Sequence, residues 1–241
     1  MNLCIDQGNS FSKLGVYKSD QPEITYTCRS TDCSVLYEQI FSQYPIEHII
    51  LSTVGKHDSA LTAYLQTKAP LIELGPKTEL PFVSAYTTPE TLGADRIAAV
   101  AGAWSQQPGH DILVIDAGTA ITYDFIDAGG VYRGGNIAPG VHLRAKALND
   151  YTQRLPLVEL EEDVELLGKD TVTAIRAGII YGVVFEIDGY IDRLMLKYPK
   201  LLTFLTGGST FYFENKLKNR IFADKNLVLT GLNSILRHNV Q

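Results

Sequence analysis

Two short polar segments, about 110 residues apart, carry the residue types best suited to chemistry. They read Asp6-Gln7-Gly8-Asn9-Ser10 and Asp116-Ala117-Gly118-Thr119-Ala120, and each lies between two β-like runs. A glycine at a sharp turn exposes backbone N–H groups beside the carboxylate, which suits a phosphate chain carrying a divalent metal. The repeat therefore predicts two related lobes that clasp one nucleotide, as in an ATP-dependent phosphotransferase.

The two aspartates are the candidate cation ligands. Proteins usually supply only one or two carboxylates for the Mg²⁺ that accompanies ATP. We expect Asp6 to bind Mg²⁺, through a water molecule, and Asp116 to hold a second, monovalent cation. For either residue alone, a turn-forming or capping role is the alternative.

The residues around the aspartates could bind phosphate. Gly8 allows close approach of the backbone, Asn9 and Ser10 can donate hydrogen bonds, and Lys13 is a point charge suited to the β- and γ-phosphates. Lys13 is otherwise a solvated strand lysine. In the second segment the corresponding residues are Gly118, Thr119 and Thr122.

Two glycine-rich segments further along the chain could also line a ligand. Gly207-Gly208-Ser209 follows an apolar run and could let a ring or ribose lie against the backbone, or could simply connect a strand to a helix. The segment 134–140, Gly-Gly-Asn-Ile-Ala-Pro-Gly, is expected to be a flexible loop that lines a substrate pocket or turns the chain.

Asp95 and Arg96 begin an alanine-rich apolar segment and are the candidate acceptor site. A carboxylate that takes a hydroxyl proton, next to a guanidinium that binds an anion, suits a kinase. Proton removal can be late in phosphoryl transfer, so a carboxylate of ordinary pKa can serve. A simple helix cap is the alternative for Asp95.

Composition and charge limit the function. The 241 residues suit two lobes, and a net charge of −6 gives no basic footprint for nucleic acid. Cys4, Cys28 and Cys33 have no metal-like spacing, so a reduced, intracellular setting is expected, with Cys4 in the core. No apolar run is long enough to cross a membrane, and Asp6 and Gly8 interrupt any signal peptide.

The pattern of apolar residues predicts two α/β lobes, over 1–108 and 109–241, each a mixed sheet flanked by helices with ligands between the lobes. Strands are expected at 2–7, 13–17, 23–28, 48–54, 111–116, 122–126 and 201–206. Helices are expected at 36–43, 59–67, 93–104, 141–150, 171–198, 211–219 and 230–239.

Taken together, these motifs resemble those of type III pantothenate kinases, in the superfamily of acetate and sugar kinases, heat-shock chaperones and actin. The resemblance runs nearly end to end and implies an actin-like (ribonuclease H-like) fold in both lobes. It also implies transfer of the ATP γ-phosphoryl group to the 4′-hydroxyl of pantothenate, the first step of coenzyme A synthesis, by a cytoplasmic homodimer. The motifs that carry it are 6–10, 93–96, 116–120, 134–140 and 206–208.

The resemblance also implies roles for individual residues. Asp95 is the general base, Asp116 binds potassium or ammonium, and Thr171 reaches the substrate from the partner subunit. The implied ATP contacts are Asp6, Gln7, Gly8, Asn9, Ser10, Phe11, Ser12, Lys13, Thr119, Gly207 and Gly208. The implied pantothenate contacts are Tyr86, Gly93, Ala94, Asp95, Arg96 and Thr171.

The chain departs from the family pattern at three places. Ser10 stands where threonine is more frequent, Ile97 where an aromatic residue often follows the Asp-Arg pair, and Thr87-Thr88-Pro89 where Asn-Pro usually follows the tyrosine. None removes a catalytic group. Two alternatives on the same fold are a nucleotide or polyphosphate hydrolase and an ATP-binding regulatory protein.

Overall fold

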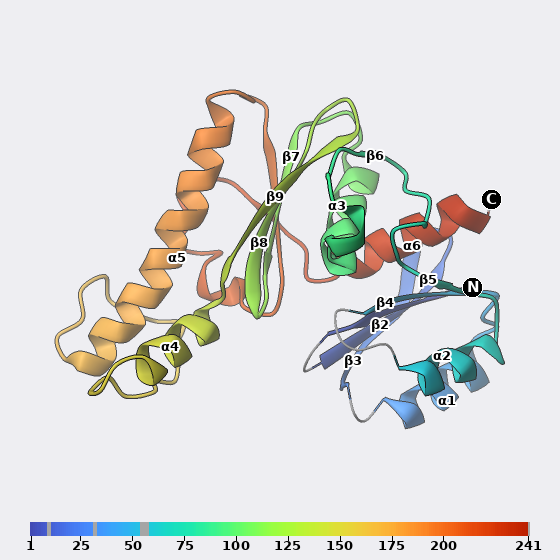
Figure 1. Ribbon diagram of the computed structural model, residues 1–241, viewed down its shortest axis with the longest axis horizontal. Helices are drawn as coiled ribbons and strands as arrows, with labels where there is room; N and C mark the ends of the chain where they lie inside the picture. Colours follow the sequence, from blue (N-terminus) through green and yellow to red (C-terminus); the bar gives the residue numbers. More distant parts are fainter. Residues whose placement is uncertain (9–10, 31–32, 54–57, 241) are drawn as a thin grey trace. The chain divides into compact units, whose positions relative to one another are not determined.

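The computed structural model describes residues 1–8, 11–30, 33–53 and 58–240 (Figure 1). Contacts within the chain define two units. The first comprises Met1–Pro108, Gly130–Tyr132 and Asn226–Gln241, and the second comprises Gly109–Gly129 and Arg133–Lys225. The lobe boundaries expected from the sequence, 1–108 and 109–241, stay a prediction about the domains.

The first unit is built on a five-stranded mixed sheet in the order β3-β2-β1-β4-β5. Its strands are β1 (Asn2–Gln7), β2 (Phe11–Lys18), β3 (Gln21–Arg29), β4 (His48–Thr53) and β5 (Leu71–Glu73). The hairpin β1–β2–β3 is antiparallel, whereas β4 and β5 run parallel to β1. Alternate residues of a strand share one face, and Leu3 and Ile5 pack with Tyr37, Ile40 and other residues of the helices that cover this face.

Four helices complete the first unit: α1 (Ser34–Gln43), α2 (Ser59–Gln66), α3 (Ala94–Gln106) and α6 (Leu227–Val240). Residues of α1 and α2 belong to the same core cluster as Leu3 and Ile5, and α6 packs against β1, β4 and α3. A Cβ atom on Gly231 would collide with the carbonyl of Ala98. The small residues of α3 are therefore explained by its close approach to α6.

The second unit repeats the strand order of the first. Its strands are β7 (Ile112–Ala117), β8 (Ala120–Ile126), β9 (Val131–Pro139), β10 (Leu202–Thr206) and β11 (Phe222–Ala223). They lie in the order β11-β10-β7-β8-β9, with β7–β8 antiparallel and β10 parallel to both β7 and β11. The two Asp-x-Gly segments therefore mark a repeated strand topology. β1 and β7 are each the central strand of their five, and each pairs antiparallel with the strand that follows it.

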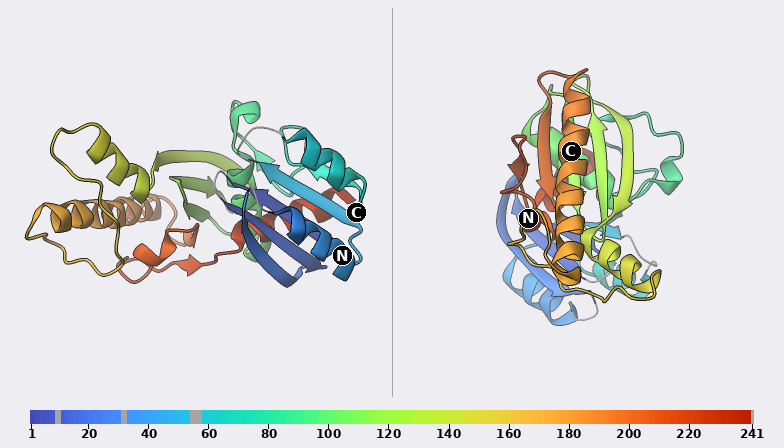
Figure 2. Two further views of the ribbon diagram at one scale, coloured as in Figure 1. Left: turned by 90° about the horizontal axis from the view of Figure 1, so that it is seen from below. Right: turned by 90° about the vertical axis from the view of Figure 1, so that its left-hand side faces the viewer.

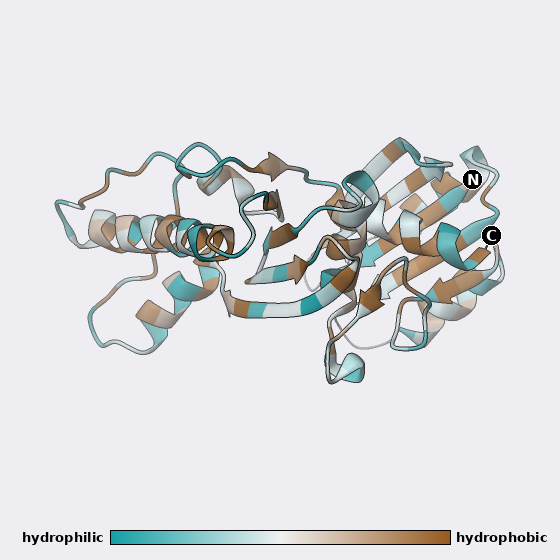
Figure 3. Cartoon of the chain, turned by 90° about the horizontal axis from the view of Figure 1, so that it is seen from above, coloured by the Kyte–Doolittle hydropathy of each residue, from teal (hydrophilic) through white to brown (hydrophobic). Residues whose placement is uncertain are grey.

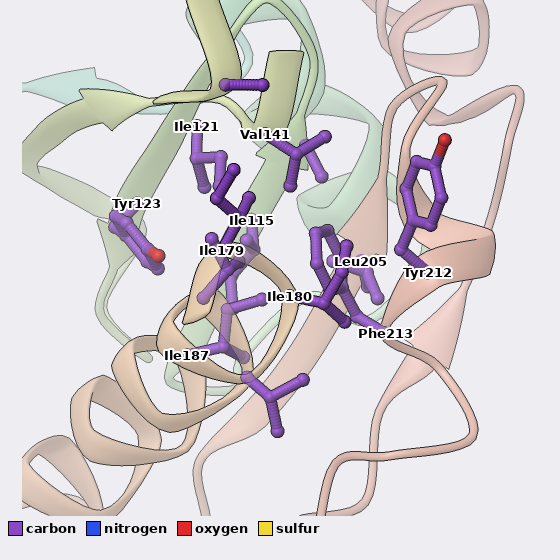
Figure 4. Close-up of a cluster of buried hydrophobic side chains, with 14 of the residues drawn as sticks. Ile115, Ile121, Tyr123, Val141, Ile179, Ile180, Ile187, Leu205, Tyr212 and Phe213 are labelled. Atoms are coloured by element: carbon purple, nitrogen blue, oxygen red, sulfur yellow. The ribbon is translucent and has the colours of Figure 1, made fainter. Parts of the chain in front are cut away.

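Helices α4 (Val141–Asp150) and α5 (Thr171–Met195) pack against this second sheet, and α5 is a single helix of 25 residues (Figure 2). Ile179, Ile180 and Ile187 of α5 meet Ile115 of β7 and Leu205 of β10 in one apolar cluster (Figure 4). This burial of large aliphatic side chains is the main stabilising contribution to the second unit.

The short strand β6 (Val83–Ser84) and the 3₁₀ turn η1 (Pro89–Thr91) precede α3. β6 pairs in parallel with the first residues of β9, so that Ser84 lies opposite Tyr132. Val131 and Tyr132 belong to the first unit, while the rest of β9 belongs to the second. β6 thereby extends the second sheet to six strands.

Most elements predicted from the sequence are confirmed within a few residues, because strand and helix periodicities were strong. Two are wrong. Residues 134–139 are not a loop but the end of β9; a Cβ atom on Gly135 would lie 2.6 Å from Asp124 Oδ1 and collide with the carbonyl of Tyr123, so glycine serves close packing there. Residues 211–219 form no α-helix, only the 3₁₀ turn η2 (Thr210–Tyr212).

The cysteines differ from the expectation of reduced thiols. Cys4 is buried and free, as expected, but Cys28 and Cys33 are joined by a disulfide. Cys28 lies near the end of β3, and Cys33, five residues later, directly precedes α1. Figure 3 shows hydrophobic residues along the strands of both sheets. In the described part of the chain, no helix is long and apolar enough to span a membrane.

Candidate functional site

The first Asp-x-Gly segment forms the turn between β1 and β2. The Gly8 amide donates to the carbonyl of Phe11 at 3.1 Å, which closes the turn directly after Asp6 and Gln7. Asn9 and Ser10 lie outside the described residues. Phe11 is 55% exposed and therefore offers a solvent-facing ring next to the turn.

Two serines, Ser12 and Ser30, form hydrogen bonds next to this turn. Ser12 is buried, and its Oγ lies 3.0 Å from Ser30 Oγ, while Ser30 Oγ donates to the carbonyl of Gly8 at 2.9 Å. The Ser12 hydroxyl is thus engaged within the protein. Ser30, which the sequence did not single out, lies inside the segment closed by the Cys28–Cys33 disulfide. No sequence signal marks it, because its role depends on where β3 ends.

Asp6 lies at the end of β1, between Lys13 of β2 and Ser52 of β4 in the strand register. Burial, and then repulsion from the Asp95 carboxylate, raise its pKa to about 6, while Lys13 and Ser52 act in the opposite direction. The structure therefore brings Asp6 and Asp95 close enough to interact. Two neighbouring carboxylates and one lysine form an arrangement that can bind a cation and a phosphate group.

Asp95 lies in the first turn of α3. The helix begins after Gly93, and a Cβ atom on Gly93 would collide with Asp95 Oδ1 unless that carboxylate moved. Asp95 Oδ1 accepts from the Arg96 amide at 2.8 Å. The N-cap position of α3 is Gly93, which has no capping side chain. Asp95 is therefore not the helix cap that was the alternative role for it.

Arg96 is only 5% exposed and is held by aromatic side chains. Its Nη2 donates to Tyr132 Oη at 3.1 Å, and its guanidinium carbon lies 5.6 Å from the centre of the Tyr86 ring. The Tyr86 and Tyr132 rings stack, with centres 6.1 Å apart and planes at 24°. Tyr86 and Arg96, predicted from the sequence, are therefore neighbours, and Tyr132 is a residue that the sequence analysis missed.

The second Asp-x-Gly segment forms the turn between β7 and β8 in the second unit. The Gly118 amide donates to the carbonyl of Ala120, and the Thr119 carbonyl accepts from the Gly140 amide, both at 3.0 Å. Thr119 is exposed. Gly207 has φ +101°, and a Cβ atom on it would lie 2.5 Å from Asp116 Oδ1. Asp116, Thr119 and Gly207 thus lie at the ends of β7 and β10, and Gly208 follows and is exposed.

Thr171 is exposed at the first position of α5. Its position is fixed by a capping box, in which Asp170 accepts from the Thr173 amide at 2.9 Å and Thr173 Oγ1 accepts from the Asp170 amide at 3.1 Å. These hydrogen bonds lower the pKa of Asp170. The threonine is therefore presented at a well-defined helix start.

One carboxylate in each unit, Asp6 and Asp116, is the candidate ligand of a cation. Within residues 1–8, 11–30, 33–53 and 58–240, no group of three or more His, Cys, Asp or Glu side chains could hold a metal. Asp6 and Asp95 repel each other, and a divalent cation beside Asp6 would relieve that repulsion. The Asp116 carboxylate lies against the Gly207 backbone, because a Cβ atom on Gly207 would lie 2.5 Å from Asp116 Oδ1.

Comparison with known proteins shows the family of the chain. The sequence model of the family described as type III pantothenate kinase matches residues 2–193. The chain belongs to the type III pantothenate kinase family. A relative with that description from Phocaeicola vulgatus is 48% identical over 242 residues, covering 99% of both chains. One from Cytophaga hutchinsonii is 39% identical and covers 100% of both chains.

Solved structures support the fold of this family member. A Campylobacter jejuni protein described as a conserved Baf family transcriptional activator has a TM-score of 0.63 at 25% identity, with 98% of each chain covered. A ROK family glucokinase from Streptomyces griseus, in complex with glucose and AMPPNP, has a TM-score of 0.54 at 11% identity, covering 98% and 99%. The predicted fold class, two mixed sheets flanked by helices as in actin-like sugar kinases, is confirmed.

Proposed function

We propose that this chain transfers the γ-phosphoryl group of ATP to the 4′-hydroxyl of pantothenate, the first step of coenzyme A synthesis. The observation that carries the proposal, beside family membership, is the meeting of Asp6 and Asp95 next to the Gly8 turn. A phosphate-binding turn, a carboxylate for a cation and a second carboxylate at a helix start are the parts that a kinase needs.

In this proposal Asp95 is the general base. Its carboxylate accepts the proton of the 4′-hydroxyl as the new O–P bond forms and the bond to the ADP oxygen breaks. The repulsion between Asp95 and Asp6 favours a proton on one of the two carboxylates once the substrate hydroxyl gives it up. Arg96, with Tyr86, Gly93 and Ala94, binds pantothenate, and the guanidinium neutralises its carboxylate.

The ATP contacts are proposed from both turns. Gln7, Gly8, Asn9, Ser10 and Lys13 bind phosphate oxygens, Phe11 and Ser12 shape the turn, and Thr119, Gly207 and Gly208 supply contacts from the second unit. Mg²⁺, when bound, neutralises the developing charge on the phosphates. Asp6 would hold it, directly or through water, and Asp116 would hold potassium or ammonium.

We also propose a homodimer formed through α5. Gly178, Gly182, Phe185 and Gly189 recur at intervals of four, three and four residues and so share one face of the helix. Phe185 is 61% exposed, and a Cβ atom on any of the three glycines would meet nothing within 4 Å. A small-residue face with one exposed aromatic suits close packing against a second copy, which would bring Thr171 to the partner's pantothenate.

We also propose a cytoplasmic location, where a kinase has ATP as its phosphoryl donor. Intracellular reductants would then act on the Cys28–Cys33 disulfide. Neither nucleic acid nor a membrane is a proposed partner.

The test is an assay of ADP release with ATP, Mg²⁺ and pantothenate, run in potassium and then in sodium. Release that requires pantothenate and potassium supports the substrate, the reaction and the cation. Release without pantothenate would instead support the nucleotide hydrolase, the first alternative. ATP binding by calorimetry without any release would support the regulatory protein, the second.

A further inference from the structure

The disulfide between Cys28 and Cys33 encloses a residue that holds the candidate phosphate-binding turn. The two cysteines are five positions apart, and Ser30 lies between them. Ser30 Oγ donates to the Gly8 carbonyl at 2.9 Å and lies 3.0 Å from the Oγ of the buried Ser12. Because Gly8 engages the proton of the Ser30 hydroxyl, Ser12 is the donor in the second contact. The segment closed by the disulfide is thereby connected both to β2 and to the Gly8 turn.

The disulfide restricts the part of the chain that carries Ser30. Cys28 is paired with Ser12 in the register of β3 with β2, and Cys33 lies in the apolar core of the first unit, 4% exposed. β3 ends at Arg29, so Ser30 lies beyond the strand. A covalent link between residues so close in sequence limits the conformations of the chain between them. When the link opens, Ser30 gains conformations, and its hydroxyl meets the Gly8 carbonyl less often.

A small reductant can reach this disulfide. Cys28 is half-buried, and Cys33 lines a pocket of about 440 Å³ together with Ser30 and Gln7. A pocket of that volume admits a small dithiol. The same pocket therefore gives access both to the disulfide and to the residue that follows Asp6 at the end of β1.

The first unit can accommodate the reduced cysteines as well. Cys28 Sγ lies 3.8 Å from the carbonyl oxygen of Ser12. Cys33 Sγ lies 3.2 Å from the carbonyl oxygen of Arg29. Each thiol formed by reduction thus has an acceptor for its weak S–H donor. Opening the disulfide should loosen Ser30 without unfolding the unit.

We propose that the Cys28–Cys33 pair is a redox switch for ATP affinity that acts through Ser30 on the Gly8 turn. A dithiol reductant supplies two electrons and two protons: the S–S bond breaks, two thiols form, and the reductant closes its own disulfide. A disulfide oxidant reverses the exchange. The oxidised chain binds ATP more tightly, because its turn is held in place before the phosphates arrive. This inference rests on the proposed function, which places ATP phosphates at the Gly8 turn.

The measurement is the affinity for ATP with Mg²⁺, by calorimetry, of oxidised enzyme and of enzyme reduced with dithiothreitol and then desalted. Reduction should raise the Kd about three- to tenfold, the effect of losing one hydrogen bond. In turnover, the KM for ATP should rise similarly, while kcat and the KM for pantothenate change less than about twofold. Alkylation of the unfolded chain verifies the state: Cys4 alone reacts when the disulfide is closed, and all three cysteines react when it is open.

Three variants test the route through Ser30. Cys28→Ser cannot form the disulfide, so its Kd should equal that of the reduced wild type with or without dithiothreitol. Ser30→Ala keeps the disulfide but lacks the hydroxyl; its Kd should rise to a similar extent, and reduction should then have less than half of its wild-type effect on log Kd. Ser42→Ala is the matched control, because it removes a serine hydroxyl of the same unit that donates to the Gln39 carbonyl at 2.8 Å. It should change neither the Kd nor the response to reduction.

Several results would overturn the switch. These are equal ATP affinity in the two states, an oxidant that leaves all three cysteines open to alkylation, and a Ser30→Ala variant that responds to reduction as fully as the wild type. A reduced enzyme whose kcat and pantothenate KM change as much as its ATP affinity would also overturn it, because that indicates general loosening. Calorimetry needs no turnover. A chain whose ATP affinity follows the redox state, but which shows no pantothenate-dependent ADP release, would refute the kinase and retain the switch.

Discussion

Replacing Asp6 by asparagine should separate the stability of the first unit from its activity. Burial and the Asp95 carboxylate raise the pKa of Asp6 from 3.8 to about 6, so the folded state holds this proton more tightly than the unfolded chain does. As the pH rises from about 4 to 6, the unfolded state loses the proton first, and the free energy of unfolding falls. Above pH 6 the loss is complete.

The magnitude follows from these two pKa values. One pKa unit corresponds to about 1.4 kcal/mol, so the rise from 3.8 to about 6 costs the folded state about 3 kcal/mol near neutral pH. Asp6 is partly exposed, and water screens part of that cost, which leaves about 2 kcal/mol. Asparagine carries no charge and should recover it.

The assay is urea unfolding at pH 7.5 and at pH 4, without nucleotide or divalent cations. Asp6→Asn should be about 2 kcal/mol more stable than the wild type at pH 7.5, nearly equal to it at pH 4, and inactive as a kinase. The control is Glu23→Gln, on the exposed strand β3, which should change neither value. Equal stability of Asp6→Asn and wild type at pH 7.5, or the same gain at both pH values, would refute the reasoning.

Four further substitutions test separate parts of the proposal. Asp95→Asn should lower kcat about 10²- to 10⁴-fold and retain ATP binding by calorimetry; a near-normal kcat would contradict its role as base. Asp116→Ala should weaken the dependence of the rate on potassium, and an unchanged potassium titration would exclude the cation site. Thr171→Ala should raise the pantothenate KM about three- to tenfold and the ATP KM less, whereas equal effects would argue against a substrate contact. Gly182→Arg should convert a dimer to a monomer in light scattering, while Glu23→Arg should not; a Gly182→Arg dimer would rule out the α5 interface.

Local patterns in the sequence predicted much of the fold. Apolar runs of five or six residues ending in Asp-x-Gly predicted the central strands β1 and β7, because a buried strand needs apolar side chains and its end needs a turn. The same pattern predicted which carboxylates lie at the ends of these strands. The hydrophobic spacing of 171–198 likewise predicted α5 to within three residues of its observed end.

Patterns failed where distant segments decide the conformation. Gly134 and Gly135 read as a loop, yet they continue β9, because β8 offers hydrogen-bonding partners and space for no larger side chain. Residues 211–219 read as a helix, but Tyr212 and Phe213 are both buried in the second core. Adjacent residues of an α-helix point in different directions, so burying both aromatic side chains is incompatible with a surface helix, and the helical turn η2 ends after three residues.

The sequence by itself determined the repeat, the strands that end in aspartate and the alanine-rich helix that begins with Asp95 and Arg96, since each depends on neighbours within a few residues. Only the tertiary structure decided that Asp6 and Asp95 interact, that Ser30 supports the first turn and that Tyr132 holds Arg96. Each of those contacts joins residues separated by more than twenty positions, and such distances are set by sheet register and helix packing, which local residue patterns do not encode.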